Sequence, residues 1–189
     1  MIAVAASLLL TSCNESRPGN DNNANDDRDE AAAESNKDKF EGKKQRDAAF
    51  VYEVVESNYG EIKLAELAHQ RSRTPEVKQV AQQLLTDHTA SLNELKTLAQ
   101  AKAISVPVEE TDASKRKLEN MAEEEGNDFD EAWCDEMMEM HNKTIDKFEK
   151  RLDDTEDAEL KAFINKTLPV LREHHERLKA CEKVKRSKV

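Results

Sequence analysis

The sequence predicts an all-α protein, a four-helix bundle behind a disordered N-terminal tether. Charged residues make up 37% of the 189 positions and aromatic residues 4%, with only four glycines and four prolines. A composition rich in helix formers and poor in turn formers favours long helices over sheets. Apolar residues also recur at three- and four-residue steps in four long segments, and no segment alternates polar and apolar residues as a strand would.

The first twelve residues predict a lipoprotein signal peptide. Residues 2–10 are almost wholly apolar. This run is too short for a membrane span, which needs about 20 residues, but it suits the core of a signal peptide. It is followed by Leu10-Thr11-Ser12-Cys13, which resembles the lipobox of bacterial lipoproteins. The resemblance implies that residues 1–12 are removed and that Cys13 receives acyl chains, palmitate among them.

The residue after this anchor bears on the destination of the protein. In similar lipoproteins an Asp at that position retains the protein in the inner membrane, whereas this chain has Asn14. We therefore expect a lipid-anchored protein of the outer membrane that faces the periplasm. Signal peptides normally begin with positive charge, but no Lys or Arg precedes the apolar run. We take this as the sign of a late-assigned start or of a truncated chain.

Residues 13–46 are the predicted tether. Asn, Asp, Glu, Ser, Lys and Ala dominate positions 14–45, where Phe40 is the only large apolar side chain. Such a stretch buries too little apolar surface to offset its conformational entropy, so we expect it to be disordered. As a flexible chain of about 32 residues, it would hold the folded part roughly 30 Å from the membrane.

Residues 47–182 are expected to form the bundle, and residues 183–189 a frayed basic tail. Asp47 is a suitable N-cap for a first helix that ends near Arg71, and Thr74-Pro75 begins the second. A third helix starts at Asn127-Asp128, and a fourth follows a turn at residues 153–157. The stripes that define the four helices are, in order, Phe50, Val54, Asn58, Glu61, Ala65 and Ala68; Val77, Ala81, Leu84, His88, Leu92, Leu95 and Ala99; Phe129, Trp133, Met137, His141, Ile145, Phe148 and Leu152; and Leu160, Phe163, Ile164, Leu168, Leu171, His174, Leu178 and Cys181.

The middle connection, residues 102–127, is long and contains a predicted short helix near residues 113–125. Two paths are compatible with its length. It either crosses the whole length of the bundle or folds over one end of an up-down-up-down arrangement.

Four polar residues lie on the core-facing stripes, one on each helix: Glu61, His88, His141 and His174. Counted from the helix ends, the first three lie at nearly one height, and His174 falls about six residues from His141, or roughly 9 Å. Imidazoles and a carboxylate on facing helices within an apolar shell form a candidate site for a divalent transition metal. The alternative is that each histidine is a hydrogen-bonded core residue.

Other polar and sulfur-containing residues are weaker metal ligands. His69 lies near the end of the first helix and His175 beside the stripe of the fourth. The Met137, Met138 and Met140 group is interpreted as core filling rather than as a copper site. Asp87 cannot share the face of His88, but it can cap a neighbouring group.

Cys134 and Cys181 are a candidate disulfide. An oxidising periplasm permits the bond, and the two residues are on neighbouring helices. Counting residues on either side of the turn between the third and fourth helices places Cys181 opposite Asp128, about six residues from Cys134. The disulfide therefore requires the helix end to bend. No histidine or basic partner is evident at the level of these cysteines along the bundle, so a nucleophile role has no support and we expect no catalytic residue.

Several segments together resemble a bacterial family of unknown function, DUF4142, whose members are often named as outer membrane proteins. The resemblance covers residues 47–178 and rests on Asp47-Ala48-Ala49-Phe50, Gly60-Glu61-Ile62, Leu67-Ala68, residues 77–88, Phe129-Asp130 with Trp133 and His141, and Leu168-Pro169 with His174. It implies a ferritin-like fold with Glu61, His88, His141 and His174 at recurrent polar positions, and it implies no activity. Trp133 stands where the family usually has Tyr.

The expected function is that of a non-enzymatic envelope lipoprotein that binds a metal ion or a protein partner. The net charge of -11 argues against nucleic acid, which needs a basic surface. The alternative function is ferritin-like redox chemistry or metal storage. Di-iron carboxylate bundles carry Glu-x-x-His on two helices, but Leu85 and Leu171 stand three residues before His88 and His174, which argues against that alternative.

Overall fold

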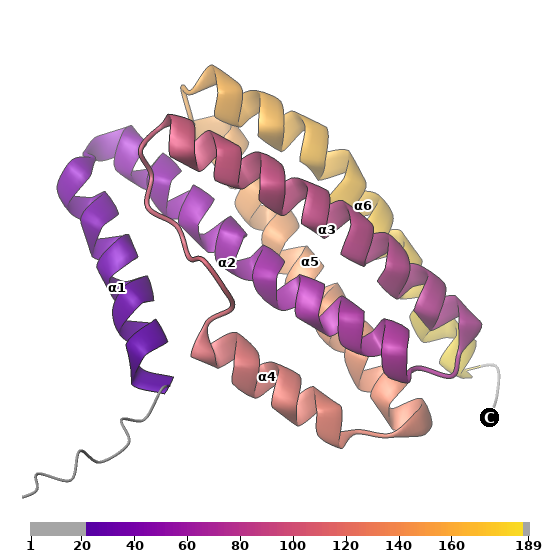
Figure 1. The fold of residues 1–189 in the computed structure, drawn as a ribbon. Coiled ribbons are helices and arrows are strands. Elements are labelled where there is room, and N and C mark those ends of the chain that lie inside the picture. The colour runs from indigo at the N-terminus through magenta and orange to yellow at the C-terminus, as the bar shows by residue number, and fades with distance from the viewer. Residues whose placement is uncertain (1–21, 187–189) are drawn as a thin grey trace, which may run out of the picture.

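A computed structural model describes residues 22–186, which form six helices and no strand (Figure 1). The predicted all-α class is therefore confirmed. The predicted signal peptide, Cys13 and residues 187–189 lie outside the described residues. None of the described helices is long and apolar enough to cross a membrane. In chain order the helices are α1 (Asn22–Lys39), α2 (Gly42–Arg71), α3 (Pro75–Ala101), α4 (Asp112–Glu123), α5 (Gly126–Asp154) and α6 (Ala158–Arg186).

The four long helices, α2, α3, α5 and α6, lie side by side (Figure 1). α2 packs most extensively against α3, and α5 against α6, so each pair is a helical hairpin. The two hairpins meet where α3 lies against α6 and α2 against α5. Two shorter helices, α1 and α4, lie on the outside of α2.

The connection between the hairpins crosses the full length of the molecule (Figure 1). It starts at the end of α3, where Lys102 pairs with Asp157 at 2.6 Å beside the start of α6. It ends beyond α4, where Arg71 at the end of α2 donates a hydrogen bond to the Glu124 carbonyl at 3.0 Å. Of the two paths that the sequence left open, the structure takes the crossing one. As a result α3 and α5 run in the same direction, and each long helix is antiparallel to both of its packed neighbours.

The helix boundaries differ from the sequence prediction in two places. α2 begins at Gly42, whose φ of +59° favours glycine, and not at Asp47. Asp47 instead accepts a hydrogen bond from Thr155 at 2.9 Å and lies 3.4 Å from Arg151 at the turn between α5 and α6. α6 continues to Arg186, past the boundary predicted for the basic tail. Pro75 occupies the first turn of α3, as predicted.

The prediction of a disordered tether at residues 13–46 is wrong from residue 22 onward, where α1 and the start of α2 lie. The side chain of Asn36 is buried and forms two hydrogen bonds with the Ser105 backbone, at 2.7 and 2.8 Å. Tyr52 donates a hydrogen bond to the Asp29 carbonyl at 3.1 Å, and Phe40 packs against the core. These contacts with distant segments stabilise a helix whose own sequence is too polar to indicate burial.

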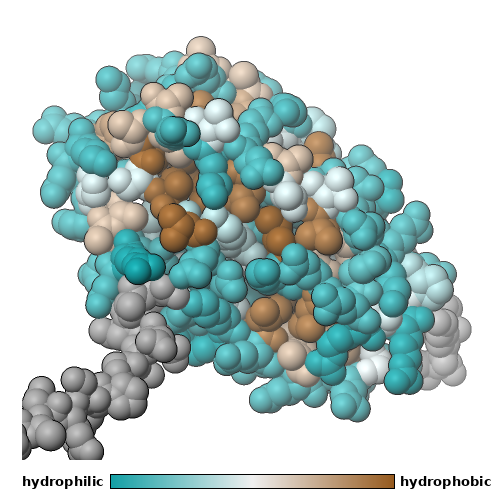
Figure 2. All heavy atoms as spheres, viewed as in Figure 1, coloured by the Kyte–Doolittle hydropathy of each residue, from teal (hydrophilic) through white to brown (hydrophobic). Residues whose placement is uncertain are grey.

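The viewed surface is largely hydrophilic, and its apolar side chains gather along α2 between α1 and α4 (Figure 2). Inside, the apolar core is divided into two clusters. One contains Phe50, Phe148 and Phe163, and the other contains Leu84 and Trp133. Between them, on every long helix, lies a polar layer made of Asn58, Glu61, His88, His141 and His174. The candidate site is therefore a layer across the middle of the core.

Candidate metal centre

The structure brings together all four polar residues that the sequence singled out. Glu61 comes from α2, His88 from α3, His141 from α5 and His174 from α6, and their exposed fractions are 1%, 4%, 0% and 2%. His141 Nε2 lies 3.4 Å from His88 Nε2 and 3.3 Å from His174 Nδ1. The three histidines thus each place one ring nitrogen within 4.8 Å of the others.

The second ring nitrogen of each histidine points outward and donates a hydrogen bond. His141 Nδ1 donates to the Met137 carbonyl at 2.8 Å, an oxygen that can only accept. His174 Nε2 donates to the Asp87 carboxylate at 2.8 Å. His88 Nδ1 donates to Asn58 Oδ1 at 3.1 Å, because the amide nitrogen of Asn58 is engaged with the Val54 carbonyl.

These outer bonds set the protonation of the inner atoms. A neutral imidazole carries one proton, so a histidine that donates from one nitrogen has a lone pair on the other. In the neutral form of each ring, His88 Nε2, His141 Nε2 and His174 Nδ1 therefore carry the lone pairs, and these three atoms lie close together. Metal-binding histidines have this same arrangement, in which a carbonyl or carboxylate holds the outer nitrogen.

The spacing of the inner nitrogens suits a tetrahedral ion. Two nitrogen ligands at about 2.0–2.1 Å from a tetrahedral metal lie about 3.3–3.4 Å from each other. The separations from His141 to His88 and to His174 are 3.4 and 3.3 Å. These two separations match the spacing of nitrogen ligands around a tetrahedral ion.

Glu61 lies at one side of the histidine group. Its Oε1 accepts a hydrogen bond from Ser57 at 2.7 Å. Its Oε2 lies 3.2 Å from His88 Nε2 and 3.6 Å from His141 Nδ1, and it is buried without a hydrogen-bond donor. The group whose ligand atoms all lie within 4.8 Å of one another contains the three histidines and not Glu61. Glu61 therefore adds a negative charge beside the histidine nitrogens.

Burial favours the neutral forms of His88 and His174. Burial lowers the pKa of His88 to about 4, although attraction to Glu61 opposes the change. Burial also lowers the pKa of His174, against the opposing hydrogen bond to Asp87. Burial alone would raise the pKa of Glu61, but attraction to His88 and His141 and the Ser57 hydrogen bond outweigh it, and the net direction is downward.

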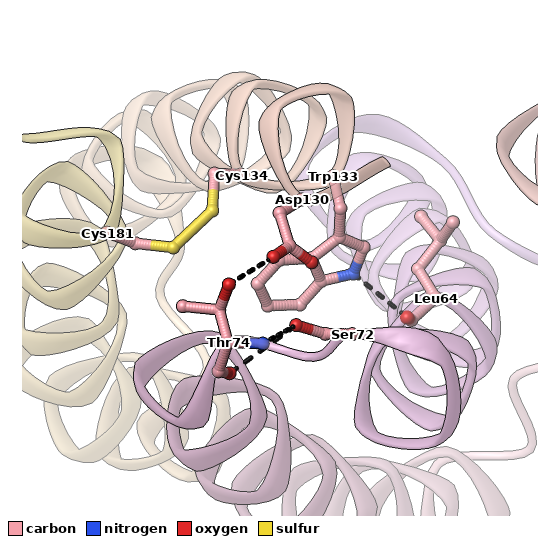
Figure 3. Close-up of a disulfide and its surroundings, with 7 residues drawn as sticks. All are labelled: Leu64, Ser72, Thr74, Asp130, Trp133, Cys134 and Cys181. Atoms are coloured by element: carbon pink, nitrogen blue, oxygen red, sulfur yellow. Dashed lines mark hydrogen bonds between the residues drawn. A yellow bond between two sulfur atoms is a disulfide. The ribbon is translucent and has the colours of Figure 1, made fainter. Parts of the chain in front are cut away.

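One helix register places both His174 and Cys181 opposite their partners on α5. Cys134 precedes His141 by seven residues, and Cys181 follows His174 by seven. Because α5 and α6 are antiparallel, the register that joins His141 to His174 also joins the two cysteines. They form a disulfide with a Cα separation of 6.6 Å (Figure 3). The predicted six-residue offset is wrong, because the point about which the hairpin folds lies about three residues later than assumed.

The disulfide lies at the end of the core that Trp133 fills (Figure 3). Trp133 is fully buried and donates a hydrogen bond from Nε1 to the Leu64 carbonyl at 2.9 Å. Nearby, Thr74 occupies the N-cap position of α3, but its side chain forms no capping hydrogen bond and instead donates one to Asp130 at 2.5 Å. These contacts connect α2, the α2–α3 turn and α5 on one side of the polar layer.

The weaker metal-ligand candidates lie apart from the site, and one supporting residue, Asn58, has a role that the sequence did not predict. His69 is exposed, and His175 is half-buried beside Glu176. Asn58 was placed on the core-facing stripe, but its role toward His88 was not predicted, although a polar residue on an apolar stripe is a usable signal. Asp87 does cap a neighbouring group, as proposed from its position next to His88, and that group is His174.

The metal-free protein should lose stability as the pH falls below about 6.5. The unfolded chain protonates His88 and His174 near their ordinary pKa of 6.5, and the folded chain does so only at lower pH. The loss of Glu61 ionisation acts in the same direction at still lower pH. In chelator-treated protein, the free energy of unfolding in urea should fall by about 1–3 kcal/mol between pH 7.5 and pH 5.5. His88→Asn should reduce this dependence, whereas His69→Asn should not; equal slopes in all three proteins would contradict the assignment.

Comparison with known proteins gives a family and no activity. No curated protein matches the chain, and no solved structure matches it. The family described as Domain of unknown function (DUF4142) matches residues 30–181, a range that runs from within α1 to the disulfide cysteine of α6. The chain belongs to the DUF4142 family.

Proposed function

We propose that this protein binds one divalent transition-metal ion through His88, His141 and His174, with the charge of Glu61 beside them. The observation that carries the proposal is the set of three buried imidazole nitrogens whose lone pairs face one another. A core that only needed hydrogen-bonded histidines would place a donor between such atoms. Here each donor is turned outward, to Met137, Asn58 or Asp87.

Charge supports the same proposal. Glu61 places a carboxylate in the core, and its Oε2 is buried with no hydrogen-bond donor. An isolated buried charge is strongly unfavourable unless a partner compensates it. A divalent cation between the histidine nitrogens compensates the carboxylate and occupies the three lone pairs at once. Imidazole ligands favour zinc, copper, iron or nickel over magnesium or calcium.

The donor set favours a single ion over a di-iron pair. Di-iron carboxylate bundles use four glutamates together with two histidines, and this layer offers three histidines and one glutamate. We nevertheless infer a ferritin-like four-helix bundle, because one long crossover and antiparallel neighbours describe that topology. The fold and the donor set thus point to metal binding without ferritin-type iron oxidation.

Metal content tests the proposal. Protein prepared without a tag and dialysed against Zn(II) or Cu(II) should retain about one ion per chain. An ion at one hundred times its Kd should stabilise the fold by about 2.7 kcal/mol. His141→Ala should abolish retention, because it removes the central nitrogen, and His175→Ala should preserve it as a matched control. Sub-stoichiometric metal in the wild type, or the same content in both variants, would refute the site.

We further propose that Cys13 anchors the protein by lipid to the outer membrane, facing the periplasm, where an envelope protein is the expected partner. The support is the apolar run and the Leu10-Thr11-Ser12-Cys13 motif. Several acyl chains on one residue give stable attachment, since each buried methylene adds about 0.8 kcal/mol.

Metabolic labelling tests this anchor. Cells that express the full chain and are fed tritiated palmitate should yield a labelled protein in the membrane fraction. Cys13→Ser should remove both the label and the membrane association, and Cys181→Ser should retain both. Label on the Cys13→Ser protein would rule out this residue as the anchor.

A further inference from the structure

A small cavity lies on one side of the histidine layer. Its volume is about 20 Å³, and its walls include Glu61, His88 and His174. A cavity of this size holds about one water molecule. His141 is not among the residues that line it, so the cavity meets the layer on the side away from the central imidazole.

Each of the four long helices contributes one hydroxyl side chain to this cavity: Ser57 from α2, Ser91 from α3, Thr144 from α5 and Thr167 from α6. All four lie toward the α2 N-terminal side of the polar layer. The opposite side of the layer is formed by apolar residues such as Leu64 and Met137. The layer therefore has hydroxyl groups on one side, where they line the cavity together with apolar residues such as Val54 and Phe148.

The cavity also leads toward solvent. Ser91, Thr144 and Thr167 are half-buried, whereas the histidines are buried. Glu61 lines the same cavity, and its Oε2 has no hydrogen-bond donor. A ligand that carries hydrogen-bond donors would satisfy this oxygen, and the hydroxyl groups provide further partners.

We propose that the metal ion keeps one coordination position open to a water-sized ligand, which occupies this cavity and donates a hydrogen bond to Glu61 Oε2. The inference rests on the proposed metal site and adds the class of ligand that this site would take, a neutral hydrogen-bond donor of the size of a water molecule. Three protein ligands and one exchangeable water are the arrangement of catalytic zinc sites, whereas structural zinc sites have four protein ligands.

Water exchange at Cu(II) tests the open position directly. The Thr167→Leu substitution places a larger side chain in the cavity. With one Cu(II) bound, the longitudinal relaxivity of the water protons per copper should be at least about twofold higher in the wild type than in this variant. Thr97→Leu, an exposed position on α3, is the matched control and should behave as the wild type. Equal relaxivity in the wild type and Thr167→Leu would overturn the open position even if copper binds stoichiometrically.

A second measurement does not depend on the folding of the Thr167 variant. Azide carries a negative charge and has no hydrogen to donate, so Glu61 should oppose its binding. The isosteric Glu61→Gln variant should bind azide about tenfold more tightly than the wild type in Cu(II) absorption titrations. Azide affinity that is unchanged by Glu61→Gln would show that the carboxylate does not face the ligand. Failure of Cu(II) to bind at all would overturn both the open position and the metal site itself.

Discussion

Three imidazole rings meet in the middle of an apolar core with their lone pairs turned toward one another, and this contact constrains most of the surrounding structure. Lone pairs at 3.3 and 3.4 Å repel unless something positive lies between them. Glu61 makes a nearby positive charge more favourable, because its Oε2 is buried and has no hydrogen-bond donor. A metal cation in the layer would compensate the charge of this carboxylate.

The hydrogen bonds behind the rings determine which way the rings face. His141 is held by a carbonyl of its own helix, whereas His174 depends on Asp87 of α3 and His88 on Asn58 of α2. Each of the latter two bonds crosses between helices, so the orientation of a ligand and the packing of a helix pair are determined together. Asp87 is in turn held by Gln83 at 2.6 Å, one turn earlier on α3. Metal affinity and helix packing should therefore respond to the same substitutions.

The disulfide and the histidine pair share one register of α5 against α6. A slip of one turn would separate His141 from His174 and Cys134 from Cys181 at the same time. A covalent link across a sequence separation of 47 residues restricts the unfolded chain, and it also excludes other registers of the folded hairpin. Pro169 lies inside α6 between the turn and His174, and the helix continues through it.

Sequence reasoning predicted the helices and the four polar residues well, because each rests on local periodicity. Glu61, His88 and His141 were expected at one height from residue counts alone. The position of His174 depends on the residue at the centre of the turn between α5 and α6. An error of about three residues in that centre shifts the residue expected opposite His141 by about six positions. The crossing path of residues 102–111 and the order of α1 depend on contacts between distant segments, such as that of Asn36 with Ser105. Helix propensity and amino-acid composition do not indicate such contacts.

X-ray absorption at the zinc edge measures the central claim most directly. Zinc-loaded protein should show imidazole scattering from three nitrogen ligands at about 2.0–2.1 Å, with a fourth light atom and no sulfur. His174→Ala should lower the imidazole count, and His175→Ala should leave the spectrum unchanged. A spectrum with oxygen ligands only, or one that is the same for both variants, would contradict a metal centre in the histidine layer.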